Sequence, residues 1–248
     1  MCASFLIRAN TSEIVEVLDQ LFLPHDAEGL GEFANPLGDI DLRVLPHRRC
    51  PVFVINDGVL VVRPMQFSLI PSWSPDRRPK FATHNARIES VIEKPTWRVP
   101  FAQKHCLVPM THFLEPIYTG SFANHMVRFF APEAKGKTSS LQSKFQIMLS
   151  VAVWEEWVDR ESGEVIESMS LLTSEPLKFV NEIGHDRGLI FLPRDLERKW
   201  LETGKNTGVQ NQSDQISPAQ WVSLLQKNRL EPHGLSVESD RVMKAKSL

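Results

Sequence analysis

Residues 50–70 read CPVFVINDGVLVVRPMQFSLI, and this stretch predicts a β-hairpin at the centre of the fold. Two runs rich in β-branched and aromatic residues lie on either side of Asn56, Asp57 and Gly58. An Asp-Gly pair between such runs is typical of a tight hairpin turn, because that turn needs positive φ angles. We therefore expect two antiparallel strands here.

The rest of the chain mixes strands and helices. We expect further strands within residues 145–157, 158–174 and 188–193, and helices over residues 11–22, 174–184, 193–203 and 217–228. The second of these helices should be capped by Ser174 and end at Gly184. Because strands and helices do not alternate regularly, the pattern favours an α+β fold, with an antiparallel barrel-like β core and peripheral helices. We assign one domain to residues 1–235 and a polar, frayed tail to residues 236–248.

The composition of the chain indicates its cellular compartment and the kinds of partner it could bind. The chain has 248 residues, of which 42% are hydrophobic and 23% charged, and a net charge of −2. This charge gives no general attraction to polyanions, so a nucleic acid would have to bind at a local basic patch. Three cysteines fit a reducing compartment, and no signal peptide or long apolar run is present. We expect a cytoplasmic protein that contacts no membrane, and a monomer.

The common cofactor motifs are absent from the sequence. It contains no GxxxxGKS/T, GxGxxG, HExxH or CxxC pattern, which are signatures of nucleotide and metal sites. We expect no cofactor and no metal ion.

Polar residues in apolar settings are the candidate site. In THNARIES (83–90), alternation would place Asn85, Arg87 and Glu89 on one face of an extended segment, or else at a solvated edge with an Arg–Glu pair. Glu115 lies in an apolar run that would raise its pKa and suit proton transfer, unless its side chain points to water. His185 follows a predicted helix end and suits proton shuttling near neutral pH, although it could instead interact with the helix dipole.

A basic and aromatic stretch covers residues 72–87. Arg77, Arg78 and Arg87 are interleaved there with Trp73, and Arg43 lies upstream. A single-stranded nucleic acid could use cations for its phosphates and rings for its bases. A solvated charged surface is the alternative interpretation.

Several short motifs occur together in a specific order. They are Cys2, IPSW (70–73), NARIES (85–90), CLVP (106–109), FLE (113–115), VWEEWVDRESGEVI (153–166), LLTSEP (171–176) and IGHDR (183–187). This order resembles the SRAP family, named for SOS response-associated peptidase, from Cys2 to about Pro193. The resemblance implies a single α+β domain that binds single-stranded DNA and crosslinks to abasic sites through a processed N-terminal cysteine. It also implies an autopeptidase activity that removes Met1.

The same resemblance assigns roles to particular residues. Cys2 matches the nucleophile, Asn85 and Arg87 match the NAR motif of the active site and DNA groove, and Glu115 and His185 match the remaining catalytic positions. The DNA-binding set would comprise Arg87, Arg43, Trp73, Arg77 and Arg78, with single-stranded DNA containing abasic sites as the partner.

The expected chemistry follows from an amine and a thiol on adjacent carbons. The α-amine of Cys2 could attack the aldehyde of a ring-opened abasic site, and the thiol could close a five-membered thiazolidine. Glu115 would position the amine and move protons, His185 would protonate the sugar oxygen, and Asn85 would hold the reacting oxygen. We therefore expect these four side chains to converge, with Glu115 shielded from water and the N-terminal segment buried as a strand.

Two other functions use the same residues. A cysteine hydrolase would use Cys2 activated by His185 to cleave peptides in trans. A non-catalytic binding module would have kept the fold and lost the chemistry. Departures from the family pattern at Ala3, Ser4 and Pro116 favour the second of these alternatives.

Overall fold

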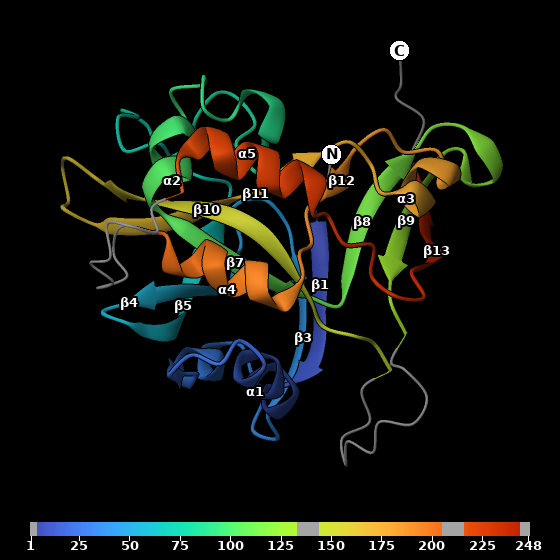
Figure 1. Cartoon of the computed structure of the whole chain (residues 1–248), viewed down its shortest axis with the longest axis horizontal. Helices are drawn as coiled ribbons and strands as arrows, with labels where there is room; N and C mark the ends of the chain where they lie inside the picture. Colours follow the sequence, from blue (N-terminus) through green and yellow to red (C-terminus); the bar gives the residue numbers. More distant parts are fainter. Residues whose placement is uncertain (1–3, 133–143, 205–215, 244–248) are drawn as a thin grey trace.

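The computed structural model describes residues 4–132, 144–204 and 216–243 (Figure 1). Its strands are β1 (Ser4–Asn10), β2 (His25–Asp26), β3 (Asp39–Val44), β4 (Arg49–Asn56), β5 (Val59–Phe67), β6 (Asn85–Arg87), β7 (His105–Met110), β8 (His112–Ile117), β9 (His125–Phe130), β10 (Met148–Val158), β11 (Val165–Ser174), β12 (Gly188–Leu189) and β13 (Ser236–Val242). Its α-helices are α1 (Thr11–Asp19), α2 (Arg98–Gln103), α3 (Lys178–Ile183), α4 (Arg194–Glu202) and α5 (Pro218–Lys227). Short 3-10 helices are η1 (Glu28–Glu32), η2 (Ile88–Ser90) and η3 (Gly120–Phe122).

Five strands close into a barrel. The predicted hairpin is confirmed as β4 and β5, and its turn has positive φ at Asp57 (49°) and Gly58 (81°). From β4 the antiparallel ladder continues through β7 and β10 to β11. A parallel pairing of β11 with β5 then closes the ring. The barrel-like α+β fold expected from the sequence is therefore confirmed, with one parallel pairing in an otherwise antiparallel ring.

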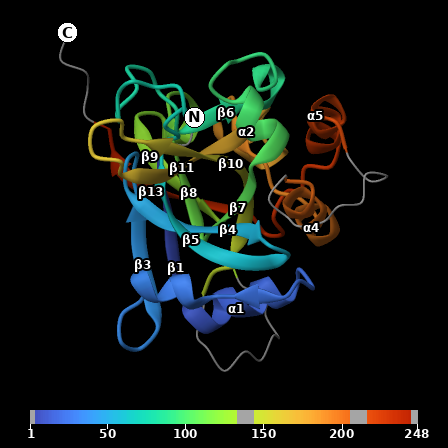
Figure 2. The same cartoon turned by 90° about the vertical axis from the view of Figure 1, so that its left-hand side faces the viewer.

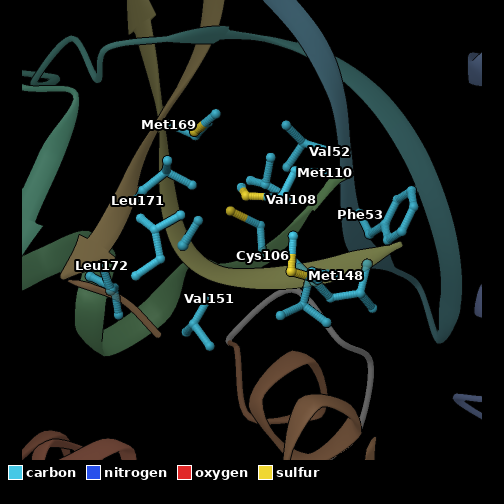
Figure 3. Close-up of a cluster of buried hydrophobic side chains, with 14 of the residues drawn as sticks. Val52, Phe53, Cys106, Val108, Met110, Met148, Val151, Met169, Leu171 and Leu172 are labelled. Carbon is cyan, nitrogen blue, oxygen red and sulfur yellow. The ribbon is translucent and has the colours of Figure 1, made fainter. Parts of the chain in front are cut away.

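Apolar side chains from several strands fill the space between the barrel strands. Figure 3 shows Val52 of β4, Cys106 and Val108 of β7, and Met169 and Leu171 of β11 gathered in one cluster, and all five are fully buried. Burial raises the pKa of the Cys106 thiol, so this cysteine packs as a small apolar residue. The barrel interior is thus a packed core that gives the site a rigid support.

A second sheet carries the N-terminal strand. Its order is β13-β9-β8-β1-β3, so β1 lies between β8 and β3. The chain passes from β7 in the barrel to β8 in this sheet through Thr111, whose hydroxyl donates to the carbonyl of Leu6 (3.1 Å) and accepts from the backbone N–H of Arg8 (3.0 Å). From Ser4 onward the N-terminal segment is a buried strand, as expected from the sequence.

The helices cover the outside of the two sheets (Figures 1 and 2). α1 begins at a capping box in which Asn10 and Glu13 satisfy each other's backbone N–H groups. α5 has the same motif at Ser217, and α3 ends at Gly184 in the left-handed conformation (φ 105°). Among the described residues, no helix is long and apolar enough to cross a membrane.

Two expectations about element ends were wrong. Ser174 does not cap α3, because it is the last residue of β11 and the helix begins four residues later, after Leu177. Residues 236–242 were placed in a frayed tail, but they form β13 and pair with β9. Their polar composition suits an edge strand, which exposes one side to water.

Candidate functional site

Glu115 and His185 form a buried pair at the boundary of the second sheet. Glu115 lies on β8 and His185 follows α3, and their side chains are 1% and 4% exposed. Nε2 of His185 is 3.2 Å from Oε2 of Glu115. The fold therefore brings together two side chains that are far apart in the sequence, and the distance between them is short enough for direct proton transfer.

The turn at Gly184 places the histidine. Its φ of 105° is costly for any residue with a Cβ atom. A Cβ added there would also lie 3.1 Å from the hydroxyl and 3.2 Å from the carbonyl oxygen of Thr119, just after β8. Glycine thus lets the end of α3 approach β8 closely enough for His185 to reach Glu115.

Burial adjusts the proton affinities of this pair. It raises the pKa of Glu115 to about 8, and the nearby Asp186 carboxylate adds to the effect. Burial also lowers the pKa of His185, and the positive charge of Arg187 lowers it further. The hydrogen bond to the Arg187 carbonyl and the charge of Asp186 raise this pKa and partly offset the decrease. Near neutral pH the pair therefore favours a protonated carboxyl group beside a neutral imidazole. The alternative of a glutamate pointing to water was wrong, and the expectation of a shielded Glu115 is confirmed.

Arg187 ties the histidine turn to the segment after β6. Its carbonyl oxygen lies 2.9 Å from Nδ1 of His185, and its guanidinium donates to both carboxylate oxygens of Glu89, at 2.9 and 3.0 Å. Glu89 therefore forms its hydrogen-bonded ion pair with Arg187, and the nearby charge of Arg87 also lowers the pKa of Glu89. The sequence motifs assign no role to Arg187, although it lies two residues after His185 in the IGHDR segment.

Asn85 and Arg87 lie on β6, which runs parallel to β11. Asn85 pairs with Leu171 and is 6% exposed, whereas Arg87 is exposed. β12 pairs with the other side of β11, so Thr173 faces Arg87 on one side and Leu189 on the other. This arrangement brings the NAR segment and the histidine turn to the same end of β11.

Aromatic rings connect this segment to the N-terminal strand. The Phe67 ring lies 5.4 Å from the Phe5 ring of β1 and 5.8 Å from the imidazole of His84, which precedes Asn85. In the β1–β8 ladder, Phe5 pairs with Phe113, which lies two residues before Glu115. The start of β1 therefore lies between the elements that carry Asn85 and Glu115. Cys2 itself lies outside the described residues.

The residues predicted to bind DNA differ in their surroundings. Arg43 forms an ion pair with Asp240 (2.9 Å), and Arg77 forms one with Glu164 (3.1 Å). Arg78 is exposed and Trp73 is 51% exposed. Their roles in DNA binding stay predictions, and two of the arginines would have to exchange a carboxylate for a phosphate. Within the described ranges, no cluster of three or more His, Cys, Asp and Glu side chains could hold a metal ion.

Comparisons with known proteins agree with this architecture. The model of the family described as SOS response associated peptidase (SRAP) matches residues 1–230. The abasic site processing protein YoaM of Bacillus subtilis is 28% identical over 209 residues, covering 84% of this chain and 81% of that protein. YoqW of the same organism, also named an abasic site processing protein, is 27% identical over 210 residues, covering 84% and 82%. A crystal structure of a Bacteroides thetaiotaomicron protein superposes with a TM-score of 0.68 at 19% identity, covering 97% of this chain and 92% of that one, which supports the fold.

Proposed function

This chain belongs to the SOS response associated peptidase family, and on that premise we propose that it processes abasic sites in single-stranded DNA by forming a covalent crosslink through Cys2. The observation that carries the proposal is the buried Glu115–His185 pair, 3.2 Å apart. A carboxyl group with a raised pKa beside a neutral imidazole is suited to moving protons near neutral pH. The names of the two Bacillus relatives point to the same substrate.

Chain connectivity would allow Cys2 to reach this pair. Ser4 pairs with Leu114, the neighbour of Glu115 on β8. Successive Cα atoms are about 3.8 Å apart, so the Cα atom of Cys2 lies within about 8 Å of that of Ser4. The N-terminal position is essential because only a terminal cysteine offers a free α-amine and a thiol on adjacent carbons.

The proposed reaction balances without a cofactor. The α-amine of Cys2 adds to the aldehyde of the ring-opened sugar, and loss of one water gives an imine. The thiol then adds to the imine carbon while its proton passes to the nitrogen, which closes the thiazolidine. Neutral His185 would accept the proton that the amine loses on adding to the aldehyde, and protonated Glu115 would supply the proton that leaves with the hydroxyl group. His185 could protonate the ring oxygen of the sugar as it opens once it has received a proton, for example from Glu115 across their 3.2 Å contact.

Removal of Met1 must precede this reaction, because the amine is otherwise part of a peptide bond. We propose that the chain removes Met1 itself: the Cys2 thiol attacks the Met1 carbonyl, the Met1–Cys2 C–N bond breaks as the proton passes to the released α-amine, and a thioester forms. Water then hydrolyses this thioester, which releases methionine and restores the thiol. Peptide cleavage in trans would need a binding site for a second chain, and no observation favours one.

DNA would be held by exposed cations and a ring. Arg87 and Arg78 would contact phosphates, Trp73 would stack on a base, and Asn85 would hold the reacting sugar beside the pair. The protein would bind single-stranded DNA as a monomer.

A denaturing gel with abasic single-stranded DNA tests the proposal. The wild-type protein should give a heat-stable, slowly migrating band, and intact DNA of the same sequence should not. Glu115→Gln should slow band formation at least tenfold, because the proton carrier is lost. Equal rates for wild type and Glu115→Gln would remove the role of the pair, and no band with the wild type would refute the function.

A further inference from the structure

Asp240 joins the two edge strands of the second sheet. It lies on β13, and Arg43 on β3 donates to its two carboxylate oxygens at 3.3 and 2.9 Å. β3 and β13 are at opposite ends of the strand order. Five strands spaced about 4.8 Å apart would separate these edges by roughly 19 Å in a flat sheet, so the sheet must curl for the contact to form. Figure 2 shows both strands at the same side of the molecule.

Arg128 of β9 completes a cationic site around this carboxylate. Its Nε lies 3.8 Å from Oδ1 of Asp240, and another nitrogen of the same guanidinium is 3.1 Å from Glu238. Arg241, the next residue, approaches Oδ2 at 3.5 Å. The Asp240 side chain is 8% exposed, so the arginines hold a carboxylate that is largely removed from water.

A β-bulge directs Asp240 into this position. Ser239 pairs with Val127 and Arg241 with Met126, so Asp240 is the extra residue of β13 in the ladder. Bulges change the direction of a side chain and are frequent next to functional sites. The family match ends at residue 230, so the strand that supplies Asp240 lies beyond the matched region.

The cationic site adjoins the start of β1. Ser4 pairs with Leu114 and Leu114 pairs with Arg128, while Arg43 pairs with Leu6. Residues opposite one another in a ladder, and residues two apart on one strand, share a face of the sheet. Arg43 and Arg128 therefore lie on the same face as Ser4, whereas the side chain of Glu115, next to Leu114 on β8, points to the opposite face.

We propose that Arg43 and Arg128 bind a backbone phosphate of the DNA strand, and that Asp240 occupies this anion site until the strand displaces it. A phosphodiester, like a carboxylate, offers a guanidinium two oxygens for paired hydrogen bonds. The inference rests on the proposed function, because the phosphate is that of the DNA substrate. The competing interpretation is a structural clamp, in which Asp240 only holds the sheet edges together.

Fluorescence anisotropy with a labelled, undamaged single-stranded oligonucleotide separates the two interpretations. Asp240→Asn should tighten binding roughly three- to tenfold at low salt, and the slope of log affinity against log salt should steepen by about 0.7, one phosphate contact on a single strand. Glu202→Gln is the matched control, since it removes one negative charge from an ion pair with Arg198 on α4. This control should change affinity less than twofold.

A second variant keeps the test decisive if Asp240→Asn loosens β13. Arg128→Gln should weaken binding and make the salt slope shallower, and it should cancel the gain in an Asp240→Asn, Arg128→Gln double variant. Equal affinities for Asp240→Asn and Glu202→Gln, or weaker binding by Asp240→Asn, would leave Asp240 as a structural clamp. If the wild type crosslinks abasic DNA and Asp240→Asn shows no gain, the anion site alone is refuted. If neither protein binds or crosslinks DNA, the proposed function is refuted with it.

Discussion

Replacing Glu115 with glutamine should change how the stability of the protein depends on pH. The folded-state pKa of Glu115 is about 8, compared with an ordinary value of 4.5, so the folded chain binds a proton that the unfolded chain has released between these two values. Stability must therefore fall as pH rises through this window, by about 1.4 kcal/mol per pH unit. His185 acts in the opposite direction only below its ordinary pKa of 6.5, because burial lowers its folded-state pKa. Between pH 6.5 and 8 His185 no longer opposes the Glu115 effect, which amounts to about 2 kcal/mol. Burial also raises the pKa of Glu197 to about 7, but this contribution is common to wild type and Glu115→Gln and cancels in their difference.

Urea unfolding of wild type and Glu115→Gln at steps from pH 6.5 to 8 measures this effect. Glutamine keeps the shape of the side chain and cannot ionise, so the variant should gain about 2 kcal/mol relative to wild type across the window. Glu202→Gln, at a side chain that is 30% exposed, should run nearly parallel to wild type. Parallel curves for wild type and Glu115→Gln would refute a raised pKa for Glu115, and with it the proton-carrier role.

Three further predictions concern the turn, the nucleophile and the DNA contacts. Gly184→Ala should lower the free energy of unfolding by about 1–3 kcal/mol, because alanine strains the φ of 105° and meets Thr119, and it should slow crosslinking; an unchanged unfolding midpoint would contradict this. Cys2→Ser, prepared with Met1 already removed by an aminopeptidase, should lose the heat-stable adduct and leave an imine that borohydride can trap, so a full-strength stable adduct would exclude the thiazolidine. Arg87→Ala should weaken binding to all single-stranded sequences alike and reduce its salt dependence, and affinity that does not respond to salt would exclude phosphate contacts.

The sequence predicted correctly those structural elements that depend on neighbouring residues in the chain. The Asp57-Gly58 turn and the end of α3 at Gly184 depend on positive φ angles that nearby residues permit, and both appear where the sequence placed them. The parallel closure of the barrel by β11 and β5 joins residues about 100 positions apart, Ser168 and Gln66, and no local pattern encodes it.

The environment of the candidate site was only partly predictable. An apolar run around Glu115 indicated burial, which is confirmed, and the position of His185 in a short connection suggested a constrained side chain. The ion pairs of Arg43 and Glu89 were not predictable, because their partners, Asp240 and Arg187, come from distant parts of the chain. Ser174 was misassigned as a cap because its hydroxyl suits a helix start, whereas the chain continues β11 to that residue.

Peptide mass spectrometry of the adduct with abasic single-stranded DNA tests the central claim most directly. After digestion of both protein and DNA, the modified peptide should begin at Cys2, lack Met1, and carry the mass of the sugar fragment less one water. This adduct should survive without borohydride, since the thiazolidine is closed. A modification on a lysine, or on a peptide that still begins at Met1, would contradict the account.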